Sequence, residues 1–289
     1  MSIKVGTSDI YCYTGGKSFD ATRPTAIFIH GVLNDHSVWA LQSRYLANHG
    51  WNVLALDLPG HCRSSGEPPA SVEVAAQFVA ELLDSAGVAK AALIGHSWGS
   101  LIALEAAAQL KERVTHLVLV GTAFPMKVSP ALLDASRDQP QRAIRTINVF
   151  SRSTLAAPPS VLGPGTWVWG LSMALNRRVL ASNPRVNLFH LGFQACNEYA
   201  RGEQAMRDVK CPVLFVLGSQ DAMTPARSAQ KLIDAATGAN KSVHIAQLAV
   251  GHHQMSEAPE QTLLAIREFL LDSRSEGKTA SISAVAATT

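Results

Sequence analysis

The feature that most constrains the fold of this chain is the pentapeptide GHSWG at residues 95–99, which joins the apolar run 91–94 to the alanine-rich stretch 100–110. A G-x-S-x-G sequence between a strand and a helix forces a sharp turn on which the serine side chain stands exposed. Glycine is required two residues before and two residues after the serine, because a Cβ at either place would collide with the opposing backbone. The same pattern occurs by chance around ordinary turn serines, but its position here makes Ser97 the predicted nucleophile.

Short apolar runs alternate with helical patterns along most of the chain. Buried strands are expected at residues 25–30, 51–56, 91–94, 117–120, 212–217 and 242–245. Helices are expected at 71–87, with Ser71 as the N-cap and Gly87 at the C-terminal end, at 226–236 and at 260–271. This alternation is typical of an α/β protein in which helices cover both faces of a parallel sheet.

The strand rhythm is lost between residues 124 and 209, where proline clusters and aromatic residues appear instead. A structureless loop of this length is uncommon in a compact domain. We therefore expect an inserted, mostly helical cap at 124–209, with its longest helix at 186–207. The core would then consist of residues 1–123 and 210–272, and residues 273–289 would form a loose tail.

Composition narrows the function classes. The chain has 289 residues, of which 47% are hydrophobic and 16% charged, enough for one large core and a smaller lobe. The formal net charge is +3 with scattered Lys and Arg, so no nucleic-acid partner is predicted. Because Cys12, Cys62, Cys196 and Cys211 lack C-x-x-C spacing, neither a zinc site nor a redox pair is predicted, although their even number permits disulfides.

The sequence offers no candidate for membrane insertion. Residues 1–5 begin in strand-like sequence, without the basic segment and apolar stretch of a secretory signal, which favours a cytoplasmic location. The most apolar long window, 161–180, is interrupted by glycine, proline and arginine residues and is not expected to span a bilayer.

A serine hydroxyl becomes a good nucleophile when an imidazole accepts its proton and a carboxylate orients that imidazole. Asp221 follows the strand expected at 212–217, where side chains of a parallel sheet meet ligands; the alternative is an ordinary turn or helix-entry carboxylate. The rival position after the preceding strand, at residues 121–123, contains no acid. Asp221 is therefore the predicted acid.

His252 is the predicted base, because it follows the last strand and comes after the serine and the acid in the order known for nucleophile elbows. His253 is its rival. His252 is preferred because Gly251, immediately before it, leaves room for the His252 imidazole to fold inward. We expect His30 and His96 to be structural residues.

An oxyanion that develops on an attacked carbonyl needs hydrogen-bond donors that are fixed in advance. The backbone N–H of Trp98, at the start of the helix after the elbow, is one predicted donor. The other is expected from the loop after the first long strand, where Gly31 permits a turn. Val32 N–H is the first choice there and Leu33 N–H the second.

These motifs resemble those of the α/β-hydrolase fold family. The elbow, the loop at residues 30–33, the segment DLPGHCRSS at 57–65, Asp221 and His252 match the family's motifs in order, over about residues 11–271. The resemblance implies an eight-stranded, mostly parallel sheet flanked by helices, with a helical cap inserted after the sixth strand. It also implies a Ser-Asp-His triad that works without a cofactor.

Two positions depart from the family patterns. Cys62 stands where the D-x-P-G-H-G-x-S loop usually has glycine, which should affect packing more than chemistry. The elbow is also similar to that of epoxide hydrolases and haloalkane dehalogenases, which carry aspartate at the position of Ser97. A serine alkoxide suits acyl transfer, whereas an alkyl-ester intermediate requires a carboxylate, so those two activities are not expected.

The cap is expected to select the substrate. Trp167, Trp169, Met173, Phe189 and Phe193 are candidates to line an apolar pocket, and the alternative is that they only hold the lobe to its core.

Two adjacent cap residues, Arg177 and Arg178, are candidates to hold a substrate carboxylate, or else lie on a solvated face.

Three functions remain open from the sequence. The first is a serine hydrolase of small, largely apolar carboxylic esters. The second uses the same triad on carbon–carbon bonds, thioesters or lactones, or in peracid formation. The third is a ligand-binding receptor on the same scaffold.

Overall fold

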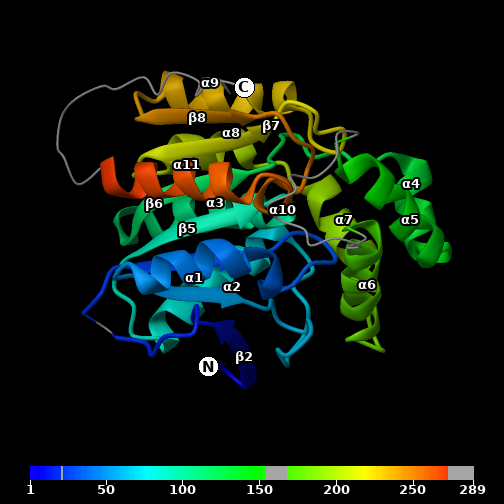
Figure 1. Ribbon diagram of the computed structural model, residues 1–289, viewed down its shortest axis with the longest axis horizontal. Helices are drawn as coiled ribbons and strands as arrows, with labels where there is room; N and C mark the ends of the chain where they lie inside the picture. The colour runs from blue at the N-terminus through cyan, green and yellow to red at the C-terminus, as the bar shows by residue number, and fades with distance from the viewer. Residues whose placement is uncertain (21, 154–167, 273–289) are drawn as a thin grey trace.

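The computed structural model describes residues 1–20, 22–153 and 168–272. Eight strands form one sheet in the order β1-β2-β4-β3-β5-β6-β7-β8 (Figure 1). The strands are β1 Ser2–Val5, β2 Ser8–Tyr13, β3 Thr25–Ile29, β4 Asn52–Leu56, β5 Ala91–His96, β6 Val114–Val120, β7 Val213–Gly218 and β8 Val243–Leu248. β1 and β2 pair antiparallel, and β2 pairs antiparallel with β4. From β4 to β8 every pair is parallel, so the sheet is mostly parallel as expected.

The central strands are short apolar runs because both of their faces are covered. Every residue of β3, β4, β5 and β7 is buried, as is usual for parallel strands between two helical layers. Alternate side chains point to opposite faces of the sheet, and each face has its own apolar core. Ile27 and Ile29 belong to one core, and Ala26 and Phe28 belong to the other. At the edge, β8 is only partly buried.

Helices cover both faces of this sheet. The helices are α1 Ala40–Asn48, α2 Val72–Ser85, α3 Trp98–Leu110, α4 Pro130–Asp138, α5 Pro140–Ser151, α6 Val168–Ala181, α7 Leu188–Glu198, α8 Gly202–Asp208, α9 Gln230–Gly238, α10 Gln254–Glu257 and α11 Pro259–Asp272. α1 and α11 pack on one face, and α2, α3, α8 and α9 form the layer on the other face. The helix expected at 71–87 is confirmed: Ser71 caps α2 by accepting a hydrogen bond from Val74 N, and Gly87 takes a left-handed φ of 65°.

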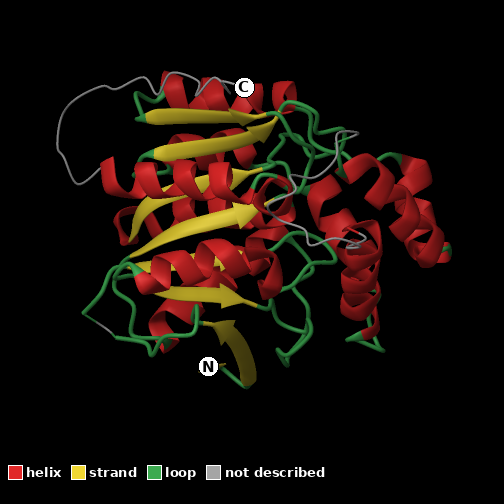
Figure 2. Ribbon diagram, viewed as in Figure 1, coloured by secondary structure: helices red, strands yellow, loops and turns green. Residues whose placement is uncertain are grey.

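Helices α4 to α7, from the segment expected to form the cap, lie together at one end of the sheet, where the arrowheads of the parallel strands point (Figure 2). They share a small apolar core that includes Ile144, Val179 and Phe189. Since ligands of open α/β sheets bind at the carboxyl ends of the strands, this arrangement places the cap over the expected site.

The single long helix expected at 186–207 is wrong, because the chain breaks into α7 and α8 there. Between the two helices, the Tyr199 hydroxyl donates to Oε2 of Glu105 on α3 at 2.8 Å, and Arg201 Nε approaches Oε1 at 3.3 Å. Glu105 is almost completely buried. Tertiary contacts with this buried carboxylate therefore accompany the interruption, and α8 packs against α3 and α9 rather than against the other cap helices.

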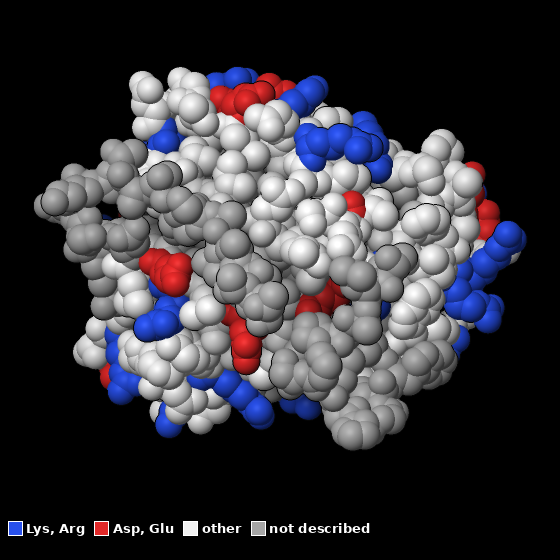
Figure 3. Space-filling model, turned by 45° about the horizontal axis from the view of Figure 1, so that its top comes forward, with Lys and Arg blue, Asp and Glu red and all other residues white. Residues whose placement is uncertain are grey.

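Several other features bear on the expectations from sequence. Cys12, Cys62, Cys196 and Cys211 are free thiols. Among the described residues, no helix combines the length and the apolar character that crossing a bilayer requires. Lys and Arg side chains are scattered among Asp and Glu on the face that Figure 3 presents. The cytoplasmic location and the division into core, cap and tail stay predictions.

Candidate active site

Ser97 sits on the sharp turn that the sequence predicts. Its backbone has φ 54° and ψ −120°, a conformation that residues with a side chain rarely adopt. A Cβ on Gly95 would lie 2.0 Å from the carbonyl oxygen of Gly99, and a Cβ on Gly99 would lie 2.4 Å from that of Ile29. The two glycines are thus required by close backbone approach, and together they hold the serine at the end of β5.

Asp221 and His252 come together from the loops after β7 and β8. His252 Nδ1 donates to Asp221 Oδ2 at 2.8 Å, and both side chains are nearly buried. Burial by itself would raise the pKa of Asp221, but the His252 imidazole and the hydrogen bonds from Thr224 outweigh it and hold this pKa below its ordinary value. The acid therefore stays ionised beside the imidazole that it orients.

Thr224 binds both members of this pair, which sequence analysis did not anticipate. Its hydroxyl lies 2.8 Å from Asp221 Oδ2, 3.0 Å from His252 Nδ1 and 2.9 Å from the carbonyl oxygen of Gly121. Its backbone N–H also donates to Asp221 Oδ1. The signal was available in hindsight as a threonine three residues after the acid, a spacing at which an acidic residue accepts hydrogen bonds from the next helical turn.

The loop that carries His252 is held by side chains of two residues, His96 and Glu257. His96 Nε2, from within the elbow, donates to the carbonyl oxygen of His252 at 2.8 Å. The carboxylate of Glu257 accepts hydrogen bonds from the backbone N–H groups of Gly251 and His253. Burial lowers the pKa of His96 to about 3 and also lowers that of His253, so both imidazoles are neutral near pH 7.

The loop after β3 lies directly against the elbow. A Cβ on Gly31 would be 3.1 Å from Ser97 Cβ, so this loop approaches the nucleophile as closely as glycine allows. Leu33 has a left-handed φ of 54°. Val32 lines the same cavities as Ser97, and Trp98 begins α3, where the first helical N–H groups lack an intrahelical acceptor. The amides predicted as oxyanion donors thus belong to two adjoining segments, the loop after β3 and the first residue of α3.

His30 has the structural position that was expected. Its Nδ1 donates to the carbonyl oxygen of Gly31 at 2.9 Å, and its Nε2 accepts from Leu58 N at 3.2 Å. Burial lowers the pKa of this imidazole, so the neutral tautomer joins the loop after β3 to the loop after β4.

Two cavities meet at the serine and the histidine. The larger has a volume of about 310 Å³, and the smaller about 40 Å³; Val32, Ser97, Phe193, Met223 and His252 line both. The remaining wall of the larger cavity is mostly apolar and comes from Met126, Val128, Leu132, Phe150, Cys196 and neighbouring residues. The remaining wall of the smaller cavity comes from Ile147 and from six polar residues, Asn34, His96, Asn148, Ser151, Asn176 and His253.

The predicted pocket residues have different positions in the cap. Phe193 lines both cavities. Phe189 is completely buried in the cap core, and Met173 packs against that core. Trp169 lies on α6 with 39% of its surface exposed, and neither it, Met173 nor Phe189 lines a cavity described above. Trp167 lies outside the described residues.

The cap arginines are engaged away from both cavities. Arg178 pairs with Asp35 at 2.6 Å, and Arg177 Nε donates to Gln141 at 3.0 Å. Neither residue lines the two cavities. The Arg178 ion pair instead fastens α6 of the cap to the loop after β3 of the core.

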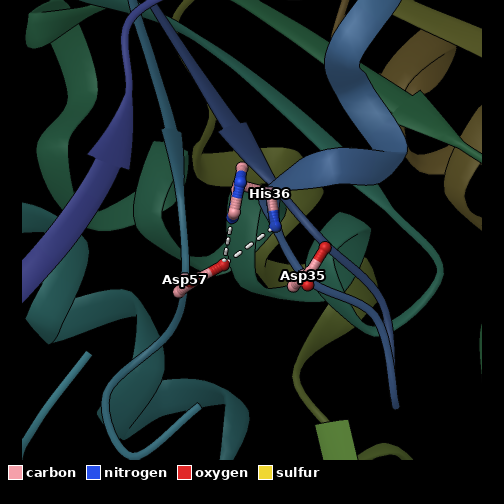
Figure 4. A group of neighbouring side chains, drawn as sticks. All are labelled: Asp35, His36 and Asp57. Carbon is pink, nitrogen blue, oxygen red and sulfur yellow. Dashed lines mark hydrogen bonds and ion pairs between the residues drawn. The ribbon is translucent and has the colours of Figure 1, made fainter. Parts of the chain in front are cut away.

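Asp35, His36 and Asp57 place potential metal-ligand atoms within 4.8 Å of one another (Figure 4). These atoms already have protein partners. Asp57 accepts from His36 N and from His36 Nδ1, which Figure 4 shows, and from Arg63 N. Asp35 accepts from Ser37 and Arg178. The His36–Asp57 contact therefore connects the loop after β3 to the loop after β4, and the Asp35–Arg178 contact connects the loop after β3 to α6.

Comparisons with known proteins identify the family to which this fold belongs. A family model described as alpha/beta hydrolase fold matches residues 24–259. The chain is 37% identical over 98 residues to the dihydrolipoyllysine-residue acetyltransferase component of the acetoin cleaving system of Cupriavidus necator, covering 34% of this chain and 26% of that protein. It is 30% identical over 141 residues to the bifunctional epoxide hydrolase 2 of Mus musculus, covering 48% of this chain and 24% of that protein.

The chain thus spans about a quarter of the length of these two curated relatives. Among solved structures, the enol-lactonase from Burkholderia xenovorans LB400 is similar with a TM-score of 0.76 and 20% identity, over 93% of this chain and 99% of that chain. This likeness in fold extends over most of the chain. With the family model covering most of its length, the chain belongs to the alpha/beta hydrolase fold family.

Proposed function

We propose that this protein is a serine hydrolase that cleaves small, largely apolar carboxylic esters through Ser97, Asp221 and His252. The observation that carries the proposal is the 2.8 Å contact between His252 Nδ1 and Asp221 Oδ2 beside the two cavities that Ser97 and His252 both line. An imidazole held in this way through Nδ1 leaves Nε2 as the proton acceptor.

In the first half of the reaction, Ser97 Oγ attacks the ester carbonyl while its proton passes to His252 Nε2. The backbone N–H groups of Val32 and Trp98 donate to the developing oxyanion. When the carbonyl re-forms, the C–O bond breaks, and the alcohol leaves with the proton from His252. Ser97 is then acylated.

In the second half, His252 takes a proton from water, and the hydroxyl oxygen attacks the acyl-enzyme. Breakdown of this second tetrahedral intermediate returns the proton to Ser97 Oγ and releases the carboxylic acid. Asp221, which its hydrogen bonds keep ionised, stabilises the imidazolium in both halves.

The apolar wall of the larger cavity supports an apolar acyl chain as its occupant. Each methylene that becomes buried should contribute about 0.8 kcal/mol, or about fourfold in kcat/KM, until the cavity is full. A series of p-nitrophenyl esters of increasing chain length tests this, and an optimum chain length is expected.

Leu132→Phe narrows the larger cavity and should shift this optimum toward shorter chains. Trp169→Ala is the matched control, because Trp169 is on the exposed side of α6 and lines neither cavity. Absence of turnover of every ester would contradict the proposed function. A profile that moves with Trp169→Ala and not with Leu132→Phe would contradict the proposed acyl site.

A further inference from the structure

The smaller cavity contains an unexplained polar group. Asn34, on the loop after β3, is only 2% exposed, and its Oδ1 is buried without a hydrogen-bond partner. An unsatisfied buried polar atom is costly enough that most proteins avoid it. Since Asn34 is part of the cavity wall next to Ser97, a bound molecule could supply the missing partner.

Two of the amide side chains around Asn34 are fixed by their own hydrogen bonds. Asn148 Nδ2 donates to the carbonyl oxygen of Ile144 and to Asn176 Oδ1, each at 2.8 Å. Asn176 Nδ2 in turn donates to the carbonyl oxygen of Leu33 at 2.9 Å. The amides of Asn148 and Asn176 are therefore held against the loop after β3, whereas Asn34 Oδ1 and, in the same wall, His96 Nδ1 have no hydrogen-bond partner among the described residues of the protein.

The wall of this cavity indicates an uncharged ligand group. Its polar residues are Asn34, Asn148, Asn176, Ser151 and histidines. Burial lowers the pKa values of both His96 and His253, which makes these imidazoles neutral. A carboxylate or an ammonium group would lose its hydration here without gaining an opposite charge from the wall.

The size of the cavity limits the ligand group further. A volume of about 40 Å³ admits only a small group, whereas the adjoining apolar cavity of about 310 Å³ has room for a chain. The two cavities meet at Ser97, so an ester whose acyl chain occupies the larger one directs its alcohol part into the smaller one. Resting on the proposed ester hydrolysis, we propose that Asn34 recognises a small, uncharged, hydrogen-bonding alcohol part of the substrate, of the hydroxyalkyl type.

An amide side chain presents an acceptor on one side and a donor on the other, and a half-turn about χ2 exchanges them. The Asn34 side chain is thus able to pair with a hydroxyl group in either sense. Replacement of that hydroxyl by a methyl group leaves the amide unpaired, which is how polar sites discriminate against isosteric apolar ligands.

The test uses two amides that differ by this one group, N-(2-hydroxyethyl)hexanamide and N-propylhexanamide. Their binding to a Ser97→Ala protein is measured by titration calorimetry, so that the result does not depend on turnover. The hydroxyethyl compound should bind about tenfold more tightly than the propyl compound. In Ser97→Ala with Asn34→Leu, which has a similar shape and no amide, this preference should disappear.

Thr146→Val is the matched control, since it removes a hydroxyl from the wall of the larger cavity and should leave the ratio of the two dissociation constants as it was. Thermal unfolding checks that each variant is folded, and the comparison of the two amides in Ser97→Ala alone stands even if Asn34→Leu fails to fold. Equal binding of the two amides, binding of neither, or a preference that survives Asn34→Leu would overturn the proposal and leave a cavity that only holds water. Ester turnover by the unaltered protein separately decides the proposed function.

Discussion

Ser151 and His252 are joined directly across the boundary between the cap and the core. The carbonyl oxygen of Ser151, at the C-terminal end of α5, accepts a hydrogen bond from the backbone N–H of His252 at 2.6 Å. Glu257 extends the connection by accepting from the N–H groups of both Ser153 and Gly251. The cap therefore contributes to the position of the proposed base as well as to the walls of the cavities.

Gly251→Ala should separate the cap from the histidine loop. A Cβ on Gly251 would lie 2.6 Å from Ser153 N and 2.7 Å from the carbonyl oxygen of Ser151, so the segment 151–153 or the loop must move. Because a displacement of about 1 Å can cost about 100-fold, kcat for a p-nitrophenyl ester should fall by at least tenfold. Gly238→Ala is the control, since a Cβ there meets nothing within 4 Å; equal kcat values for the two variants would contradict this role of the contact.

Thr224→Val should lower kcat about tenfold with little change in KM, because the hydroxyl positions Asp221 and His252 without lining the reacting bond. Loss of this donor should also raise the pKa of Asp221 toward its ordinary value. Thr224→Ser keeps the hydroxyl and should restore kcat, whereas a merely structural threonine would show a lower melting temperature with kcat unchanged.

Stability should decrease with acidification because of two buried histidines. Burial lowers the pKa values of His61 and His96 from 6.5 to about 3 in the folded chain. Below pH 6.5 the unfolded chain binds protons that the folded chain does not, so the free energy of unfolding falls as the pH falls toward 3. With both residues, the slope should approach about 3 kcal/mol per pH unit. Urea unfolding between pH 7 and 4 measures it, and a flat dependence between pH 6 and 5 would be inconsistent with two neutral, buried imidazoles.

Cys62 occupies a backbone conformation that suits glycine. Its φ is 47°, in the left-handed region, at the position where the family pattern has glycine. Cys62→Gly should relieve this strain and raise the free energy of unfolding by up to about 1 kcal/mol, or leave it unchanged. Cys62→Ala retains the strain and loses the thiol contact with Asp35, so it should be the less stable of the two in urea unfolding. The opposite order would mean that side-chain packing outweighs backbone strain here.

The parts of the site that depend on the backbone were predictable from the sequence. Gly95, Ser97 and Gly99 impose one geometry on the elbow, since neighbouring backbone atoms lie within 2.0–2.4 Å of where the Cβ atoms of both glycines would stand. The placement of Asp221 and His252 near the carboxyl ends of strands follows from the alternation of apolar runs with helices, because parallel strands bring their carboxyl ends to one edge.

The cap could not be predicted in the same way, because its helices bury apolar residues against one another and against the cavities alike. Phe189 and Phe193 are four residues apart on α7, yet only Phe193 lines the cavities. The role of Asn34 depends on partners distant in the chain, since Asn34 faces residues 148 and 176 around one cavity. Periodicity in the sequence carries no information about such contacts.

The measurement that tests the central proposal most directly is mass spectrometry of the protein after reaction with a fluorophosphonate. The account predicts one covalent adduct, located on the peptide that contains Ser97, and no adduct in Ser97→Ala, which should remain folded and lose ester hydrolysis by several orders of magnitude. His252→Ala should react far more slowly than His253→Ala, because only the first removes the base. An adduct on a different serine, or near-full esterase activity in Ser97→Ala, would contradict the assignment of the nucleophile.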